Sequence, residues 1–185
     1  MKKIRLLSLF GIALVTWMLV GCSSNNKWGD IIIEDITPSN DVVDYNDALV
    51  DAATVCLDSE NEIWNTYYSE DASTSDIQTA VDNTLSVCQS AINQINTLWD
   101  REWDSSLKDG VIAVLEKDIV YYNKFIEMLP FLDQEELTEE DKATYDNLTA
   151  ELEAIDQEIQ TANDNLVVIQ DQFSQNHGYE LETLE

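Results

Sequence analysis

The sequence predicts an all-α protein: an antiparallel, up-down-up-down four-helix bundle with coiled-coil-like packing, which follows an N-terminal signal peptide and a tether. Apolar residues recur every three or four positions through residues 39–178, the spacing that places them on one face of a helix. The chain has five glycines and two prolines, too few for the many turns of an all-β fold. Strand and helix patterns do not alternate, which argues against a parallel α/β sheet.

Residues 1–21 have the pattern of a secretory signal peptide. Lys2, Lys3 and Arg5 form a basic start, and an apolar run follows over residues 6–20. This run is shorter than the roughly 20 apolar residues that a membrane-spanning helix needs. Residues 1–21 are therefore predicted to direct export and then to be removed.

The end of the apolar run, Leu19-Val20-Gly21-Cys22, resembles the lipobox of bacterial lipoprotein precursors. The resemblance covers four residues, and they lie directly before Ser23, where polar residues begin. It implies that Cys22 receives a diacylglyceryl thioether and becomes the acylated first residue after cleavage. The alternative is an uncleaved N-terminal anchor in which the cysteine is incidental. The prediction is attachment to the membrane through lipid on Cys22.

The same resemblance bears on location. Ser23 after the lipid-bearing cysteine suits sorting to the outer membrane in a bacterium with two membranes. In a bacterium with one membrane, the signal implies the outer face of the cell membrane. We therefore expect a protein of the cell envelope, and the envelope type of the host stays open.

Residues 22–38 are predicted to form the lipidated N-terminus and a tether, because polar residues and Gly29 precede the next apolar positions.

Removal of the signal takes away three of the nine basic residues and none of the 37 acidic ones, so the net charge changes from −28 to −31. Such a surface repels nucleic acid and anionic headgroups, and we expect no nucleic-acid partner. A hydrophobic content of 44% still argues against disorder.

The first two helical patterns predict a hairpin. The first covers residues 42–67 and the second covers residues 77–99. The apolar positions of the first are Val42, Tyr45, Leu49, Ala52, Cys56, Ile63 and Tyr67. Residues 70–74 form the turn between them, and Ser73 with Asp76 predicts a capping box at the start of the second helix.

The third helical pattern covers residues 107–129 and is expected to stop or kink near Pro130. The fourth, over residues 145–173, has apolar residues spaced alternately three and four apart, a seam narrow enough for knobs-into-holes packing. Thr138 with Asp141 predicts a capping box at the start of this helix. Gly178 predicts that the helix ends in a residue with the left-handed backbone conformation.

The bundle is assigned to residues 39–178 and a C-terminal tail to residues 179–185. A break between the second and third helices is placed near Asp104, although Trp99, Trp103 and Leu107 could continue one stripe across it. Whether these two helices are separate or continuous stays open. Short connections require sequential helices to run antiparallel. The regular fourth seam could also serve an intermolecular coiled coil, so the oligomeric state stays open too.

Cys56 and Cys88 are predicted to form a disulfide. Their midpoint is residue 72, which lies in the turn between the first two helices, so the two cysteines should face each other across the hairpin. Such a pair oxidises outside the cytoplasm. Closing a loop of about 33 residues stabilises the fold by roughly 3–4 kcal/mol in the chain-entropy model. The alternative is two reduced cysteines that serve as small apolar core residues.

No pattern in the chain indicates a catalytic or cofactor site. His177 is the one histidine, and the sequence has neither a zinc-ligand cluster nor the Glu-x-x-His pairs of di-iron bundles. The segment with Asp58, Glu60 and Glu62 begins like a calcium loop, but Ile63 occupies the position that requires glycine. These three carboxylates are therefore predicted to lie on a solvated helix face. We expect no enzyme activity and no cofactor.

Aromatic residues are expected to gather in one half of the bundle. They are Trp64, Tyr67, Tyr68, Tyr121, Tyr122, Phe125 and Tyr145. Aromatic residues at helical spacing usually form core, and a binding groove is the alternative.

One end of the rod is predicted to be strongly acidic. Because the helices alternate in direction, the first and third connections should both lie away from the tether. The acidic residues there are Glu70, Asp71, Asp76, Asp133, Glu135, Glu136, Glu139, Glu140 and Asp141. Those in first helical turns interact favourably with the positive end of the helix dipole. The cluster as a whole is a weak candidate site for Ca²⁺ or for a basic protein partner, with a merely solvated tip as the alternative.

Two functions are compatible with this sequence. The first is a non-catalytic, membrane-anchored interaction or envelope-associated module. The second is a cation- or ligand-binding lipoprotein that uses the acidic tip or the aromatic half. No motif identifies the ligand or the partner.

Overall fold

The computed structural model describes residues 42–98, 105–134 and 136–178. These residues form four α-helices and no strand. The helices are α1 (Val42–Tyr68), α2 (Thr74–Thr97), α3 (Ser105–Leu132) and α4 (Glu139–His177). The predicted all-α class is confirmed.

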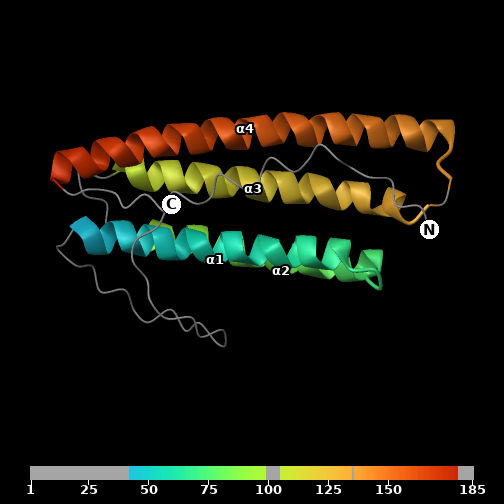
Figure 1. Ribbon diagram of the computed structural model, residues 1–185, viewed down its shortest axis with the longest axis horizontal. Coiled ribbons are helices and arrows are strands. Elements are labelled where there is room, and N and C mark those ends of the chain that lie inside the picture. The colour runs from blue at the N-terminus through green and yellow to red at the C-terminus, as the bar shows by residue number, and fades with distance from the viewer. Residues whose placement is uncertain (1–41, 99–104, 135, 179–185) are drawn as a thin grey trace.

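The four helices pack as two antiparallel hairpins, α1–α2 and α3–α4 (Figure 1). Contacts between α2 and α3 join the hairpins, whereas the backbone of α4 approaches those of α1 and α2 much less than that of α3. The α1–α2 turn and the α3–α4 connection lie at the same end of the rod, and α1 begins and α4 ends at the other (Figure 1). This arrangement confirms the predicted up-down-up-down bundle.

The turn between α1 and α2 contains the predicted capping box. The Ser73 hydroxyl accepts a hydrogen bond from the Asp76 backbone N–H at 3.2 Å, and the Asp76 carboxylate accepts one from the Ser73 N–H at 2.8 Å. Each side chain thus accepts a hydrogen bond from the other residue's backbone N–H at the start of α2. The local sequence therefore determines where α2 begins.

The end of α2 is also well defined. Leu98 caps the helix in an extended conformation, with ψ 140°. Lys108, a buried residue of α3, donates a hydrogen bond from Nζ to the Leu98 carbonyl oxygen at 3.1 Å. The structure thus separates α2 from α3. Asp104, where the break was predicted, lies outside the described residues.

The ends of α3 and α4 follow the predicted signals with two differences. Pro130 lies inside the last turn of α3, which continues to Leu132 before it ends. Thr138 caps α4 by accepting a hydrogen bond from the Asp141 N–H at 3.1 Å. The Asp141 carboxylate accepts from the Thr138 hydroxyl at 2.7 Å instead of completing a capping box. Gly178 ends α4 with φ 73°, the left-handed conformation that glycine adopts without strain.

The apolar stripes form two clusters along the rod. We call the cluster nearer the start of α1 the proximal core; it includes Leu49, Cys56, Ile92, Leu115 and Phe173. We call the cluster nearer the acidic end the distal core; it includes Ile63, Val81, Tyr121, Leu152 and Ile159. Every helix contributes to both clusters. Burial of these side chains is the main favourable contribution to folding.

The predicted signal peptide, Cys22, tether and C-terminal tail lie outside the described residues. None of the four helices is both long enough and apolar enough to cross a bilayer.

Candidate functional site

Cys56 of α1 and Cys88 of α2 form a disulfide, as predicted. Their Cα atoms are 4.5 Å apart, and both residues are buried in the proximal core. The two cysteines lie at equal distances from the α1–α2 turn, so the antiparallel hairpin brings them to the same level. The bond joins the two helices of one hairpin.

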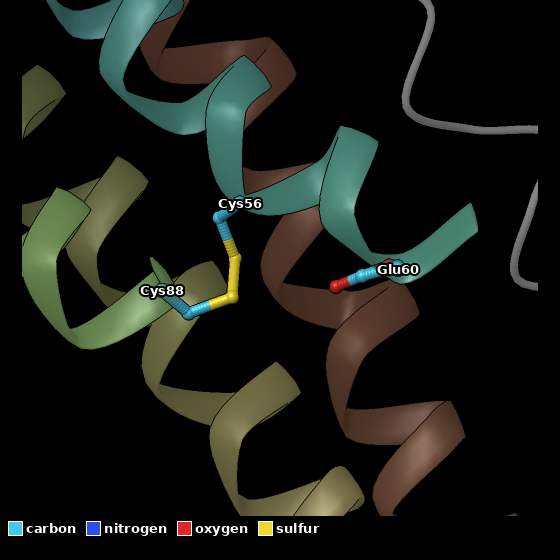
Figure 2. Close-up of side chains that lie close together, drawn as sticks. All are labelled: Cys56, Glu60 and Cys88. Atoms are coloured by element: carbon cyan, nitrogen blue, oxygen red, sulfur yellow. A yellow bond between two sulfur atoms is a disulfide. The ribbon is translucent and has the colours of Figure 1, made fainter. Parts of the chain in front are cut away.

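Glu60 lies beside this disulfide. It follows Cys56 by one helical turn, and its carboxylate points toward the sulfur atoms (Figure 2). One carboxylate oxygen and the two sulfur atoms all lie within 4.8 Å of one another. These three side chains are the one group of potential metal ligands among the described residues. In the oxidised protein both sulfurs are bonded to each other and offer no thiolate to a metal.

The prediction that Glu60 lies on a solvated helix face is wrong. Asp58 and Glu62 are exposed as expected, whereas Glu60 is only partly exposed and its Oε1 is buried. The reason is helical phase. Glu60 follows Cys56 by four residues and precedes Ile63 by three, so it occupies the core-facing position between them.

Glu60 belongs to a group of polar residues at the junction of the two cores. We call it the central polar cluster; its members are Glu60, Asp118, Tyr121, Tyr122 and Asp156. The Glu60 carboxyl lies close enough to Asp118 and Tyr122 for both to shift its pKa: the Asp118 charge raises it and Tyr122 lowers it. The rings of Tyr121 and Tyr122 meet edge to face, with centroids 5.4 Å apart. The charge of Asp156, on α4, contributes to the raised pKa of Tyr121. Three helices, α1, α3 and α4, therefore contribute to this cluster.

Several polar atoms of the central polar cluster lack hydrogen-bond partners. Asp118 is 4% exposed, and its Oδ2 is buried without a partner. The same holds for Glu60 Oε1, the Tyr121 hydroxyl and Asp156 Oδ1. A buried polar atom without a partner costs about 1–3 kcal/mol. The cluster therefore lowers the free energy of unfolding relative to an apolar interior at the same positions.

Two lysines of α3 lie near this level of the rod but pair at the surface. Lys117 contacts Glu158 at 2.5 Å, and Lys124 contacts Glu151 at 2.9 Å. Both pairs link α3 to α4 between partly exposed side chains. Such exposed pairs contribute roughly 0–1 kcal/mol each. Neither lysine is drawn inward to neutralise the buried carboxyl groups.

The buried carboxyl groups take up protons more readily than surface ones. Burial raises the pKa of Asp118 to about 7. Burial also raises the pKa of Glu60 well above its ordinary value, and the charge of Asp118 adds to the increase, while the hydrogen bond from Tyr122 opposes it. Because the charged forms are poorly solvated here, the carboxyl groups hold protons at a pH where surface carboxyls are ionised.

The aromatic residues gather in the distal core, as predicted. Trp64 and Tyr67 contact Phe125 with ring centroids 5.7 and 6.2 Å apart, and Tyr67 meets Tyr68 edge to face at 5.1 Å. Tyr68 is 50% exposed, whereas Phe125 is buried. The rings thus pack mainly on one another, in the geometries that aromatic pairs prefer.

The acidic residues of the two connections lie at one end of the rod, as predicted (Figure 1). Those exposed there are Glu70, Asp71, Asp76, Asp133, Glu136, Glu139 and Glu140. Glu135 lies outside the described residues. No three of the described carboxylates at this tip bring ligand atoms within 4.8 Å of one another. The described part of the tip is therefore not a preformed cation site, and Ca²⁺ binding there stays a prediction.

No family model, curated protein or solved structure matches this chain. Its function must therefore be inferred from its own residues. The central polar cluster and the adjacent disulfide are the features that a simple apolar bundle would not need. The polar cluster was not predicted from the sequence, whereas the disulfide was.

Proposed function

We propose that this chain is a lipid-anchored module of the cell envelope with no catalytic role, which presents a surface to a partner or supports an envelope assembly. Its place is the outer membrane in a bacterium with two membranes, and otherwise the outer face of the cell membrane. The observation that carries the proposal is the buried Cys56–Cys88 disulfide. Stable disulfides are typical of proteins outside the cytoplasm, the destination that the lipobox-like Leu19-Val20-Gly21-Cys22 implies.

The length of the bundle suits a protein that presents a surface to a partner away from the membrane. Helix α4 has 39 residues and is about 58 Å long at 1.5 Å per residue. The acidic α1–α2 and α3–α4 connections lie at the opposite end of the rod from the start of α1 (Figure 1). With the lipid attached upstream of α1, we propose that these connections face away from the membrane. Their charge favours a partner with a basic surface and repels anionic lipid headgroups.

The anchor is tested with Cys22→Ser in the full chain. Two acyl chains hold a protein on a membrane stably, whereas one does so only marginally, and this variant can carry none on residue 22. We expect wild-type protein of mature size in the detergent phase of a membrane extract. The variant should be unprocessed or released. Ser23→Ala, which keeps Cys22, serves as the control. Membrane-bound Cys22→Ser at the mature size would contradict the proposal.

Ligand binding is the second candidate function, and the unpartnered oxygens of Glu60 and Asp118 favour it. Buried acceptors of this kind are commonly satisfied by a bound group or an ordered water. A thermal-shift screen of the oxidised protein with divalent cations and small ligands separates the two functions. The proposed display role predicts an unchanged melting temperature, and a ligand-linked rise of several degrees would favour the alternative.

A further inference from the structure

The Cys56–Cys88 disulfide and Glu60 form a compact group of side chains whose chemistry does not depend on how the chain is anchored. The bond, between α1 and α2, is buried, with Cys56 0% and Cys88 1% exposed. The Glu60 carboxylate points at it from the next turn of α1 (Figure 2). An oxygen of Glu60 and the two sulfurs lie within 4.8 Å of one another.

We propose that reduction of the Cys56–Cys88 bond creates a binding site for a thiophilic divalent cation, with Zn²⁺ as the best fit. The ligands are the Cys56 and Cys88 thiolates and the Glu60 carboxylate. The disulfide and the metal compete for the same two sulfur atoms. The protein therefore binds the metal only in its reduced form.

The spacing of the three side chains suits zinc. In a tetrahedral site with Zn–S bonds of about 2.3 Å and a Zn–O bond of about 2.0 Å, neighbouring ligand atoms are roughly 3.5–3.8 Å apart. The Glu60 oxygen lies within 4.8 Å of both sulfurs. The two sulfurs are bonded to each other in the oxidised protein, so reduction has to let them move apart to the tetrahedral spacing. Thiolates favour Zn²⁺ over Mg²⁺ or Ca²⁺, which prefer oxygen ligands.

Glu60 is placed to serve as the third ligand. Its Oε1 is buried and has no hydrogen-bond partner in the oxidised protein. It comes from the same helix as Cys56, one turn away, so ligand spacing on α1 does not depend on interhelix packing. Three protein ligands leave the fourth tetrahedral position for a water molecule.

The reaction balances in two steps. A dithiol reductant transfers two electrons and two protons to the disulfide, which becomes two thiols while the reductant is oxidised to its own disulfide. Zn²⁺ then displaces the two thiol protons into solvent as the two Zn–S bonds form. In the opposite direction, a small-molecule disulfide accepts two electrons from the zinc-bound thiolates and two protons from solvent. It becomes two thiols as the Cys56–Cys88 bond re-forms and Zn²⁺ is released.

The test uses the full chain with Cys22→Ser, so that Cys56 and Cys88 are its only thiols. The protein is reduced and freed of reductant under nitrogen. It is titrated first with Co²⁺, whose absorption spectrum reports which ligands it binds, and then with Zn²⁺. We expect one Co²⁺ per chain with a thiolate-to-cobalt charge-transfer band, displaced by Zn²⁺. The oxidised protein should show no such band. Because this chain lacks the lipidation residue, failure here leaves the anchoring proposal intact.

Two substitutions on α1 distinguish a ligand from a bystander. Glu60→Gln should weaken binding at least about tenfold, since even the loss of a residue that only supports a metal ligand costs 10–100-fold. Glu62→Gln, at an exposed position of the same helix, should bind like the parent. Equal affinity of the Glu60→Gln variant and the parent would overturn the proposed ligand set.

Further outcomes also bear on the proposal. Absence of the charge-transfer band in the reduced protein, or equal binding by the oxidised protein, would overturn it. Circular dichroism follows folding throughout. If reduction lowers the helix signal, recovery on adding Zn²⁺ supports the site, and failure to recover counts against it.

Discussion

Asp118 and Glu60 place carboxyl groups where this chain otherwise places apolar side chains. Asp and Glu are almost never fully buried unless they are paired. Here the nearby lysines bond to surface carboxylates, and the buried groups reduce their desolvation cost by binding protons, as the raised pKa values of Asp118 and Glu60 indicate. The stability of the bundle is therefore coupled to pH through these residues.

The pH dependence has a definite sign. Because the folded-state pKa of Asp118 is about 7, against 3.8 as the ordinary value, the folded protein binds more protons than the unfolded chain between these values. The free energy of unfolding should therefore fall as pH rises from about 4 through 7. Each such carboxyl contributes a slope of up to about 1.4 kcal/mol per pH unit. Urea denaturation between pH 5 and about 8 measures it.

Asp118→Asn removes one titrating group and keeps the shape of the side chain. The variant should lose stability with pH less steeply than wild type and be the more stable of the two above pH 7, because it carries no buried charge. Asp164→Asn, at an exposed position of α4, should leave the slope unchanged. Identical pH slopes for wild type and Asp118→Asn would show that Asp118 does not titrate as described.

At the scale of elements, the pairing of α3 with α4 depends on a small residue. A Cβ atom at Gly110 would come within 3.1 Å of Leu166 Cδ1 and 3.3 Å of Ile169 Cδ1. Both distances are shorter than ordinary carbon–carbon contacts of about 3.5–4.0 Å. Glycine inside a helix costs roughly 0.5–1 kcal/mol relative to alanine. Gly110 therefore leaves room for the side-chain tips of Leu166 and Ile169 where α3 meets α4.

A bulkier residue at this position should separate the helices. Gly110→Val adds a branched side chain against Leu166 and Ile169, and we expect a loss of roughly 1–3 kcal/mol in the free energy of unfolding, the usual cost of overpacking. Ala113→Val, at an exposed position of α3, controls for the helix propensity of valine. Chemical denaturation measures both variants. A Gly110→Val midpoint at or above that of wild type would contradict the proposed close contact.

At the scale of the whole molecule, charge is the dominant property. The full chain carries a net charge of −28, and seven exposed acidic residues lie at the end of the rod that holds the α1–α2 and α3–α4 connections. Like charges at this density repel and oppose the compact state. Ion pairs between Lys117 or Lys124 and α4 offset only a small part of that repulsion, because they are exposed.

Salt should therefore stabilise this protein. The Debye length shortens from about 30 Å at 0.01 M to about 10 Å at 0.1 M, which screens the repulsion among surface carboxylates. We expect the melting temperature to rise by several degrees with sodium chloride over this range. Sucrose at matched osmolality controls for effects unrelated to screening. A melting temperature that falls with added salt would mean that favourable ion pairs outweigh the repulsion.

The sequence by itself determined the helices, several of their ends and the disulfide. Helical period, the Ser73–Asp76 capping box and the Gly178 end are properties of neighbouring residues, so they can be recognised along the chain. The pairing of Cys56 with Cys88 also followed from the sequence, because a short turn forces equidistant residues of a hairpin to face each other.

Only the tertiary structure decided which carboxylates are buried. A clue exists for Glu60, since the apolar spacing of three or four residues lapses between Cys56 and Ile63, where Glu60 lies. Asp118 and Asp156 have no comparable signal, because apolar Ile119 and Ile155 stand beside them. Burial at such positions depends on the rotation of each helix about its axis and on how closely its neighbours approach. Those quantities arise from packing among all four helices, and no local pattern contains them.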